Sequence, residues 1–457
     1  MNYLTRIFNK YYEGLTTRGS FTQNFAVTFS GNVLAQFLGI LFTPFIARIY
    51  GPATYGVFAL FIGLVNNLLP ISTLQLPTGY VAAEDDREFF GVLKITSVSV
   101  AITTLLCILI VWFSGDWLTT FFHVTEFRSY LIWIPVYLMF MALDNMLLGW
   151  NIRIKEFKRS AVAKVFSISS SKIATLLMGV LSVPSAGGMI LGNLITYPVE
   201  IVLKSGRAIR HSAFFSTLKD HTWHDLLLIA KKYRQYILFV TPGVFVVNFS
   251  NLLPIYFFSR FFTEREVGYF ALASSMVSLP LSLIINSSTT VFLQKAAEVI
   301  NRSKTELSTL VSTLYRKLFL LGFLPLVVLS FTSRWLFILV FGPEWERAGV
   351  FVSYLCIAAS FNVVHGPLSV LFRLMHLERI NFLTNLLFFI LKLLGLSIGL
   401  IYNDIMLSII GFSVASLISQ VMSITIIFRA VNLPLWTLVR DTMLAFVFMT
   451  IIIWVNR

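Results

Sequence analysis

Residues 93–114 read LKITSVSVAITTLLCILIVWFS and contain one charged residue, Lys94, near their beginning. An α-helix needs roughly 20 mainly apolar residues to cross the hydrocarbon core of a bilayer, so this stretch is long enough for one crossing. Similar stretches recur along the chain of 457 residues, of which 57% are hydrophobic and only 12% are charged. The composition predicts an all-α membrane protein and excludes a water-soluble globular fold.

The apolar stretches predict about twelve transmembrane helices in two sets of six. The first set is expected near residues 22–47, 56–80, 93–114, 130–150, 160–182 and 186–204, and the second near 236–259, 267–293, 314–333, 349–372, 382–401 and 405–428. A last apolar stretch, 443–455, is too short to cross unless residues 435–439 join it. A thirteenth span and an interfacial segment therefore both stay open for the C-terminus.

The distribution of basic residues predicts the orientation in the membrane, because cytoplasmic connections accumulate Lys and Arg. With the N-terminus on the cytoplasmic side, the inner segments hold 26 of the 35 Lys and Arg residues and the outer segments hold 7. The other two, Lys172 and Lys392, lie inside predicted helices. The net charge of +14 is thus explained by orientation, and we expect no nucleic-acid partner.

The two sets of helices resemble each other in sequence. Residues 48–60, RIYGPATYGVFAL, align with residues 260–272, RFFTEREVGYFAL, and this alignment pairs Gly56 with Gly268. A shift of 220 residues likewise pairs Lys172 with Lys392. Because each half has an even number of helices, we expect a parallel repeat of two six-helix bundles that can rock about a shared cleft. Duplication for stability alone is the alternative.

The chain is therefore expected to divide into five parts. These are a cytoplasmic amphipathic N-terminus (1–20), an N-terminal six-helix bundle (21–204), a basic cytoplasmic connection (205–235), a C-terminal six-helix bundle (236–430) and a C-terminal hydrophobic segment (431–457). The first part is predicted to lie on the membrane surface, because Tyr3, Ile7 and Tyr11 recur at helical spacing beside Arg6 and Lys10.

Lys172 and Lys392 lie roughly 15 to 18 Å from the cytoplasmic ends of their helices at 1.5 Å per residue. A lysine near the bilayer midplane costs about 3 kcal/mol on insertion scales. Two lysines at related positions predict a water-filled cleft that attracts an anionic substrate and excludes cationic ones. The alternative is that each lysine reaches the interface or pairs with a carboxylate such as Asp144 or Glu200.

Other polar residues fit such a cavity. Candidates for the cytoplasmic entrance are Arg153, Lys155, Lys158, Arg159, Lys164, Arg373 and Arg379. Candidates for sugar contacts are Asn32, Gln36, Asn66, Asn248, Asn251 and Asn362, although such amides often join helices instead. The two carboxylates well inside predicted spans, Asp144 and Glu200, are candidates for H⁺ or Na⁺ coupling, with a plain salt bridge as the alternative.

Motifs for other chemistry are weak or absent from the sequence. Cys107 and Cys356 lie inside apolar stretches and are expected to be packing residues. His221 and His224 form an HxxH pattern, but no third metal ligand is nearby. The sequence has no phosphate-binding loop for ATP and no nucleophile elbow. We expect no catalytic residues, no metal and no cofactor, and thus no enzyme.

The motif RIYGPxxYGVFA at 48–59, with FGPEW at 341–345, resembles the polysaccharide transporter family (Wzx-like O-antigen and capsule flippases) of the MOP superfamily. The resemblance implies an undecaprenyl-diphosphate-linked oligosaccharide as substrate, moved across the bacterial inner membrane by alternating access. It also implies coupling to an ion gradient, a cationic lumen, and a polymerase and glycosyltransferases of the same pathway as partners.

Three other functions remain as alternatives. A MATE-type multidrug or cation exporter shares the expected architecture, but a site for cationic drugs favours carboxylates over lysines at the midplane. A lipid II flippase is expected to have fourteen spans. A glycan polymerase or ligase usually carries a large periplasmic loop, whereas the longest predicted outer loops here have only about 15 residues.

Overall fold

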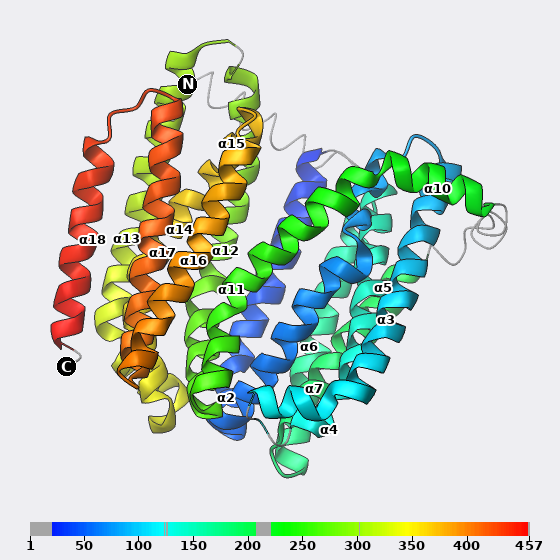
Figure 1. Ribbon diagram of the computed structural model, residues 1–457, viewed down its shortest axis with the longest axis horizontal. Coiled ribbons are helices and arrows are strands. Elements are labelled where there is room, and N and C mark those ends of the chain that lie inside the picture. Colours follow the sequence, from blue (N-terminus) through cyan, green and yellow to red (C-terminus); the bar gives the residue numbers. More distant parts are fainter. Residues whose placement is uncertain (1–20, 123, 125–126, 207–220, 301, 456–457) are drawn as a thin grey trace. The chain divides into compact units, whose positions relative to one another are not determined.

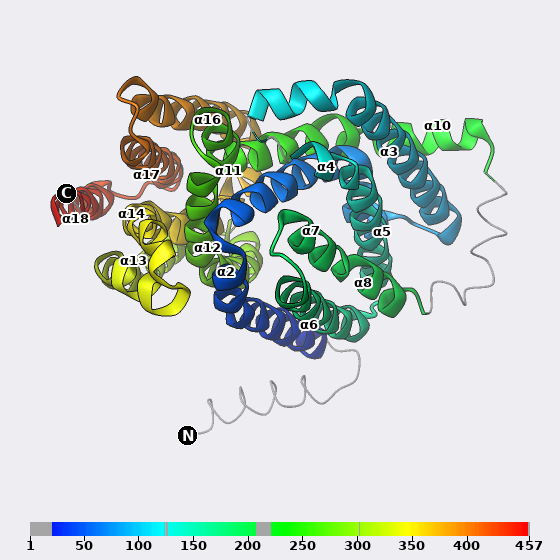
Figure 2. The ribbon, with the colours of Figure 1, turned by 90° about the horizontal axis from the view of Figure 1, so that it is seen from below.

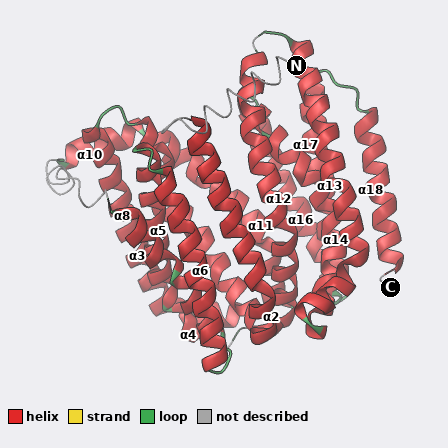
Figure 3. Cartoon of the chain, turned by 180° about the vertical axis from the view of Figure 1, so that it is seen from behind, coloured by secondary structure: helices red, strands yellow, loops and turns green. Residues whose placement is uncertain are grey.

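A computed structural model describes residues 21–122, 124, 127–206, 221–300 and 302–455. Every regular element within these ranges is a helix (Figure 3). The predicted surface helix at 1–20 and residues 207–220 of the predicted basic connection fall outside the described residues. By its contacts the chain divides into two compact units: unit 1 is Met1–Tyr50 with Val57–Phe249, and unit 2 is Gly51–Gly56 with Ser250–Arg457.

The described helices are shown along the chain in Figure 1. The helices that begin before Ser250 are α2 (Phe21–Thr73), η1 (Leu76–Ala82), α3 (Asp86–Phe122), α4 (Phe127–Leu131), α5 (Trp133–Arg153), α6 (Phe157–Leu181), α7 (Ala186–Leu194), α8 (Thr196–Ser205), α10 (Trp223–Lys232), η2 (Tyr236–Val240) and α11 (Thr241–Phe261). The later ones are α12 (Glu264–Val299), α13 (Lys304–Phe341), η3 (Pro343–Trp345), α14 (Glu346–Leu368), α15 (Val370–Leu374), α16 (Glu378–Ile401), α17 (Ile405–Ala430) and α18 (Trp436–Val455).

Twelve helical segments among the described residues are long and apolar enough to cross a membrane, which confirms the predicted fold class. One of them, Ala26–Thr73, contains two of the predicted spans. The twelfth is Trp436–Val455, so the residues before Met443 do join the C-terminal apolar stretch in one helix of 20 residues. This length suffices for a crossing.

The two predicted spans inside α2 are joined across a kink at Gly51. Its φ of 70° and ψ of 171° are non-helical values that glycine adopts without a steric penalty. Pro52 follows and starts the second half of α2. The kink replaces the connection that we expected between residues 47 and 56.

The predicted end of the second span at residue 80 is wrong, because α2 ends at Thr73. Leu74 and Gln75 both have a φ of 51°, a left-handed conformation that stops an α-helix. The chain then forms the 3₁₀-helix η1 with Pro77 in its first turn. Proline disfavours the α conformation of the residue before it, which fits a break at this point.

Unit 2 contains a reciprocal backbone contact at the two glycines that the sequence repeat pairs. A Cβ atom added to Gly56 would lie 2.0 Å from the Glu264 carbonyl oxygen, and one added to Gly268 would lie 1.9 Å from the Pro52 oxygen. Gly56 thus faces the carbonyl oxygen of the residue four positions before Gly268. Gly268 faces the carbonyl oxygen of the residue four positions before Gly56. A two-fold relation predicts this pattern, and only glycine permits so close an approach.

Part of the predicted connection forms α10, which packs against α3 in unit 1. The side chain of Thr222 and that of Asp225 form a capping box at its start. At its end, Lys232 Nζ lies 2.8 Å from carboxylate oxygens of both Glu84 and Glu88. The pairs of Lys232 therefore hold the C-terminal end of α10 on the first turn of α3 and the segment before it.

Candidate functional site

A group of buried charges lies where α5, α6 and α8 meet in unit 1 (Figure 2). Lys204 Nζ lies 2.6 Å from Asp144 Oδ1 and also pairs with Glu200. Lys164 Nζ lies 3.1 Å from Glu200 Oε1. Asp144 is 9% exposed, Lys204 2% and Glu200 1%. We call these four residues the ionic cluster.

The cluster forms because α8 carries Glu200 and Lys204 four residues apart, and residues at this spacing lie on one face of a helix. Pro198 is within the first turn of α8, where a missing backbone N–H is tolerated. The face with both charges packs against α5, which supplies Asp144, and against α6, which supplies Lys164. Three helices therefore contribute charges to one buried position.

Neighbouring polar side chains complete the hydrogen bonding around the cluster. Ser167 Oγ donates to Glu200 Oε1 over 2.8 Å. Asn151 Nδ2 donates to the Lys204 carbonyl oxygen over 3.4 Å and to Ser160 Oγ over 3.3 Å. Buried charges are tolerated when they are paired and hydrogen-bonded in this way.

The cluster is exposed on one side, at Lys164. The Lys164 side chain is 43% exposed, whereas the Glu200 side chain that it contacts is 1% exposed. Two ammonium groups face two carboxylates, so the charges balance when all four are ionised. A proton or a cation that enters through Lys164 upsets this balance and forces the pairs to rearrange, because an unpaired buried charge is costly.

A second polar contact lies on the adjoining parts of α5, α7 and α8. The Tyr137 hydroxyl donates to Asn193 Oδ1. The rings of Tyr137 and Tyr197 pack edge to face, with 5.2 Å between their centroids. These contacts tie α7 to α5 and place a tyrosine three residues before Glu200.

Lys172 lies on α6, eight residues after Lys164, or about 12 Å along the helix. It is half-buried, and no ion pair or hydrogen bond joins it to any residue that the structure describes. Asp144 and Glu200 pair with other lysines, so the alternative in which one of them neutralises Lys172 is wrong. The neighbouring Ser171 hydroxyl is buried and also has no hydrogen-bond partner.

Lys392 lies on α16 in unit 2 and is also half-buried. Its Nζ is 5.9 Å from the centroid of the Phe412 ring on α17, within the range of a cation–π contact. No carboxylate of the described residues forms an ion pair with it. That Lys172 and Lys392 bind one substrate together stays a prediction.

Arg153, a predicted entrance residue, is engaged in contacts within unit 1. Its guanidinium donates to the carbonyl oxygens of Tyr80 and Ala83 over 3.0 and 2.8 Å. It lies 3.3 Å from Asp86 Oδ1 and stacks over the Phe89 ring at 4.9 Å. These contacts anchor the end of η1 and the start of α3, and leave few donors for a ligand.

The other predicted entrance and sugar residues are distributed over several helices. Among the entrance residues, Lys155, Lys158, Arg373 and Arg379 are exposed, while Arg159 is half-buried with one guanidinium nitrogen that lacks a partner. Among the amides, Asn32, Asn251 and Asn362 are exposed, and Gln36, Asn66 and Asn248 are half-buried. Their roles in substrate binding stay predictions.

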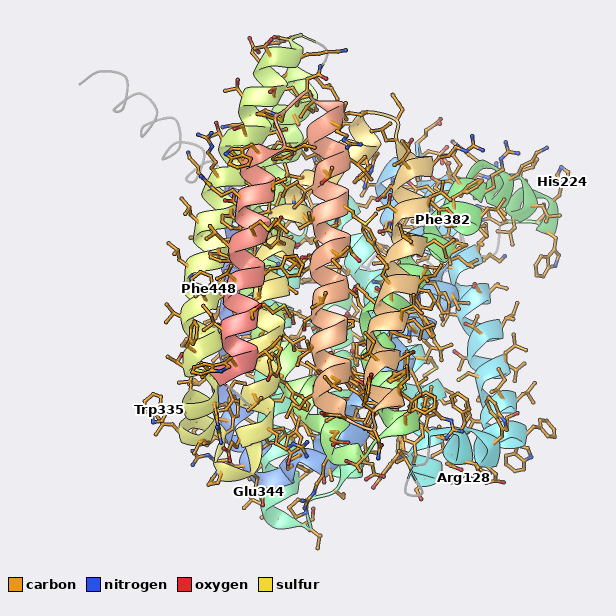
Figure 4. The ribbon with its side chains drawn as sticks, turned by 60° about the vertical axis from the view of Figure 1, so that its left-hand side comes forward. Arg128, His224, Trp335, Glu344, Phe382 and Phe448 are labelled. Carbon is orange, nitrogen blue, oxygen red and sulfur yellow. The ribbon has the colours of Figure 1, made fainter. Side chains whose placement is uncertain are left out.

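Among the described residues, no group of three His, Cys, Asp or Glu residues could hold a metal ion. In the HxxH pattern, His221 Nε2 is 2.9 Å from the Arg87 carbonyl oxygen. His224 lies at the outer surface of α10 (Figure 4). The two cysteines are free and buried, as packing residues would be.

Sequence reasoning did not identify Lys204, the last residue of the predicted span 186–204, as a site residue. It lies in the last turn of α8 and is buried beside the two carboxylates. The i,i+4 spacing from Glu200 was the available signal, because such a pair inside an apolar stretch indicates a buried ion pair. The contact with Asp144 depends on the packing of α5 against α8.

The chain resembles known proteins in its sequence and in its fold. A family model described as polysaccharide biosynthesis protein matches residues 45–350. No curated protein matches the chain. Twenty solved chains match its structure.

Three solved structures illustrate the likeness. An inward-facing multidrug resistance MATE family transporter of the MOP superfamily has a TM-score of 0.70 at 14% identity, over 89% of this chain and 98% of its own. The lipid II flippase MurJ, in an inward closed conformation, has a TM-score of 0.67 at 15% identity, over 95% of this chain and 93% of its own. A mutant of the Vibrio cholerae MATE transporter VcmN has a TM-score of 0.57 at 12% identity, over 90% of this chain and 96% of its own. At these identities, the likeness shows a common fold.

Proposed function

Because the chain belongs to the polysaccharide biosynthesis protein family, and its fold is that of MOP superfamily transporters, we propose that it is a lipid-linked oligosaccharide flippase. Its substrate is an oligosaccharide on undecaprenyl diphosphate, such as a repeat unit of O-antigen or capsule. The protein moves this headgroup from the cytoplasmic to the periplasmic leaflet of the bacterial inner membrane, with its own N-terminus in the cytoplasm.

The observation that carries this proposal is the state of Lys172. It lies inside a helix of membrane-spanning length and has no partner of opposite charge among the described residues. An isolated lysine at this depth costs about 3 kcal/mol on insertion scales, so a ligand that neutralises it during transport accounts for its presence. A diphosphate offers the required negative charge.

In the proposed mechanism the exposed basic residues collect the diphosphate at the cytoplasmic side. Lys172 and Lys392 then neutralise its charge, and the amide side chains hold the sugars. The polyprenyl chain stays in the bilayer. A rocking movement of the two halves exposes the headgroup to the periplasm, as in other transporters built from two repeated bundles.

The test is transport of a radiolabelled lipid-linked oligosaccharide by proteoliposomes that contain the Lys172→Ala, Lys392→Ala double variant. We expect transport to fall at least tenfold with unchanged protein levels, because the diphosphate loses both counter-charges. Lys172→Arg with Lys392→Arg is the charge-matched control and should retain transport. Wild-type transport by the double alanine variant would refute the assignment.

We further propose that the ionic cluster couples transport to H⁺ or Na⁺. Asp144 and Glu200 are buried beside the partly exposed Lys164, so an ion that arrives there competes with a lysine for a carboxylate. The rearrangement acts on α5, α6 and α8 together, and α6 also carries Lys172. Ion binding can thus change the position of the helix that holds the substrate.

The alternatives are separable by substrate. Dye efflux by the reconstituted protein without movement of the lipid-linked sugar would favour a MATE-type multidrug exporter. Translocation of lipid II in preference to longer lipid-linked glycans would favour a lipid II flippase. We expect neither outcome, because Lys172 and Lys392 repel cationic drugs and the matched family model describes polysaccharide biosynthesis.

A further inference from the structure

A groove lies between the C-terminal part of α12 and the N-terminal part of α13 in unit 2. It consists of two adjoining cavities of about 550 and 380 Å³. Lys295, Leu310 and Thr313 line both of them, so a single ligand can occupy the two together. Neither the proposed substrate lysines nor the ionic cluster contribute to this groove.

The groove lies close to the surface of the membrane. Helices α12 and α13 have 36 and 38 residues, well above the roughly 20 that cross the hydrocarbon core. Their joined ends extend beyond the ends of α16 and α17 (Figure 1). Lys295 is four residues from the end of α12. The groove is therefore at the level where lipid headgroups meet water, on the side that the charge distribution predicts to be cytoplasmic.

The smaller cavity has the chemistry of a phosphate site. Lys295 and Lys317 line it together with the hydroxyls of Ser287 and Ser288, and no carboxylate does. Neither lysine forms an ion pair with any residue in the described ranges. Basic pockets between transmembrane helices are known to bind the phosphates of lipid headgroups, and ammonium and hydroxyl groups are suited to this task.

The larger cavity carries the opposite charge. Glu298 and Glu306 line it with Thr305 and Thr309. The Glu298 carboxylate accepts a hydrogen bond from Gln294 over 3.5 Å, and neither glutamate has an ion-pair partner within the described part of the chain. Carboxylates in this position repel an anionic headgroup and attract a cationic one. The groove thus has a positive end and a negative end.

Apolar residues offer a place for hydrocarbon beside these charges. Val291, Phe292 and Leu314 line the smaller cavity, and Leu310 lines both cavities. Val291 is 52% exposed, although it lies on a helix that spans the membrane. An acyl chain that packs on these side chains removes apolar surface from water while its headgroup stays in the groove.

We propose that this groove is a binding site for a zwitterionic aminophospholipid of the phosphatidylethanolamine class. The phosphate lies between Lys295 and Lys317, and the ammonium group lies between Glu298 and Glu306. The site holds a lipid of the surrounding bilayer and is separate from the path of the transported lipid. Bound lipid joins the exposed ends of α12 and α13.

The test is native mass spectrometry of the purified full-length protein with phosphatidylethanolamine, phosphatidylglycerol and phosphatidylcholine of matched acyl chains. We expect phosphatidylethanolamine to be retained best. Lys295→Ala with Lys317→Ala should weaken its retention at least fivefold. Arg302→Ala with Arg316→Ala is the matched control, because it removes the same charge from exposed residues of the same hairpin that do not line the groove, and it should change retention less than twofold.

A second variant tests the negative end of the groove. Glu298→Gln with Glu306→Gln should abolish the preference for phosphatidylethanolamine and increase the retention of phosphatidylglycerol. Equal or stronger binding of phosphatidylglycerol to the unaltered protein would overturn the proposal, as would unchanged retention by the double lysine variant. Displacement of the phospholipid by undecaprenyl-diphosphate lipid, lost in the lysine variant, would instead assign the groove to the substrate.

Discussion

Units 1 and 2 differ sharply at positions that the predicted repeat makes equivalent. The shift of 220 residues that pairs Lys172 with Lys392 places Gln420 at the position of Glu200 and Ile424 at that of Lys204. It places Val364 at the position of Asp144. A cluster of buried charges in unit 1 thus corresponds to uncharged residues in unit 2.

The difference teaches that the fold does not need the ionic cluster. Val364 and Ile424 are fully buried apolar residues, so these two positions of unit 2 pack through hydrocarbon and carry no charge. The Gln420 side-chain oxygen is buried without a partner, which is a smaller penalty than an unpaired charge. Lys172 in unit 1 and Lys392 in unit 2 both lack an ion-pair partner among the described residues, whereas the carboxylates of the cluster belong to unit 1. This asymmetry favours unit 1 as the half that senses the ion.

The largest expected effect comes from Lys204→Ala. The substitution leaves Asp144 buried without an ion-pair partner and leaves Glu200 with Lys164 and the Ser167 hydroxyl. Breaking a buried ion pair costs about 3–5 kcal/mol. We expect a large fall in the melting temperature of the protein in detergent. The comparison supplies the control, since Ile424→Val removes one buried methylene from the equivalent position and costs only about 0.5–1.5 kcal/mol. If both variants lost the same stability, the ionic cluster would have no special role.

The second prediction transfers the residues of unit 2 to unit 1 in the quadruple variant Asp144→Val, Lys164→Thr, Glu200→Gln, Lys204→Ile, since the shift of 220 residues places Thr384 at the position of Lys164. Replacement of a whole buried ion-pair group by uncharged residues is often neutral or stabilising, so we expect the stability lost in Lys204→Ala to return. Gradient-driven transport should fall at least tenfold, because the carboxylates are gone. The measurement compares uptake with and without an imposed ion gradient. Full gradient dependence in the quadruple variant would show that the ion binds elsewhere.

The third prediction concerns the place where the repeated sequences still agree. Gly56→Val and Gly268→Val should each destabilise the protein by about 1–3 kcal/mol or more, because their Cβ atoms would overlap backbone carbonyl oxygens. We expect similar losses for the two variants in thermal unfolding. Gly39→Val is the control, since nothing lies within 4 Å of a Cβ added there. A large difference between the two variants would argue against a two-fold relation.

The smallest effect on stability is expected from the exposed Asp225 of unit 1, in contrast to the buried charges of the ionic cluster. Thr222 donates to the Asp225 carboxylate through its backbone N–H over 3.0 Å and its hydroxyl over 2.9 Å, and these bonds hold the pKa of Asp225 below its ordinary value. A lowered pKa means that the cap is present at neutral pH and is lost only as the pH falls below about 3.9.

Hydrogen exchange measures this cap directly. Asp225→Ala should raise the exchange rates of residues 223–226 without changing overall stability. The unaltered protein should give the same protection of α10 at pH 7 and pH 5, once intrinsic rates are corrected. Loss of protection already at pH 5 would contradict the lowered pKa. Glu378→Ala removes the same charge from an exposed residue of α16 and is the control.

The fold class could be predicted from the sequence because spans are set by apolar length, which is a local property. The end of α2 could not, since the left-handed residues Leu74 and Gln75 carry no strong turn signal. The extent of the last helix was ambiguous because Arg440 and Asp441 interrupt its apolar pattern. In the structure the two side chains pair with each other over 2.8 Å, which lowers their cost within α18.

The sequence by itself determined that the chain spans a membrane many times, and that Lys172, Lys392, Asp144 and Glu200 lie inside helices. Only the tertiary structure decided which of these charges are neutralised. The packing of α5, α6 and α8 gives both carboxylates to Lys204 and Lys164, and leaves Lys172 without a partner in the described part of the chain. The physical reason is that apolar length acts along one helix, whereas pairing of charges depends on which helices are neighbours.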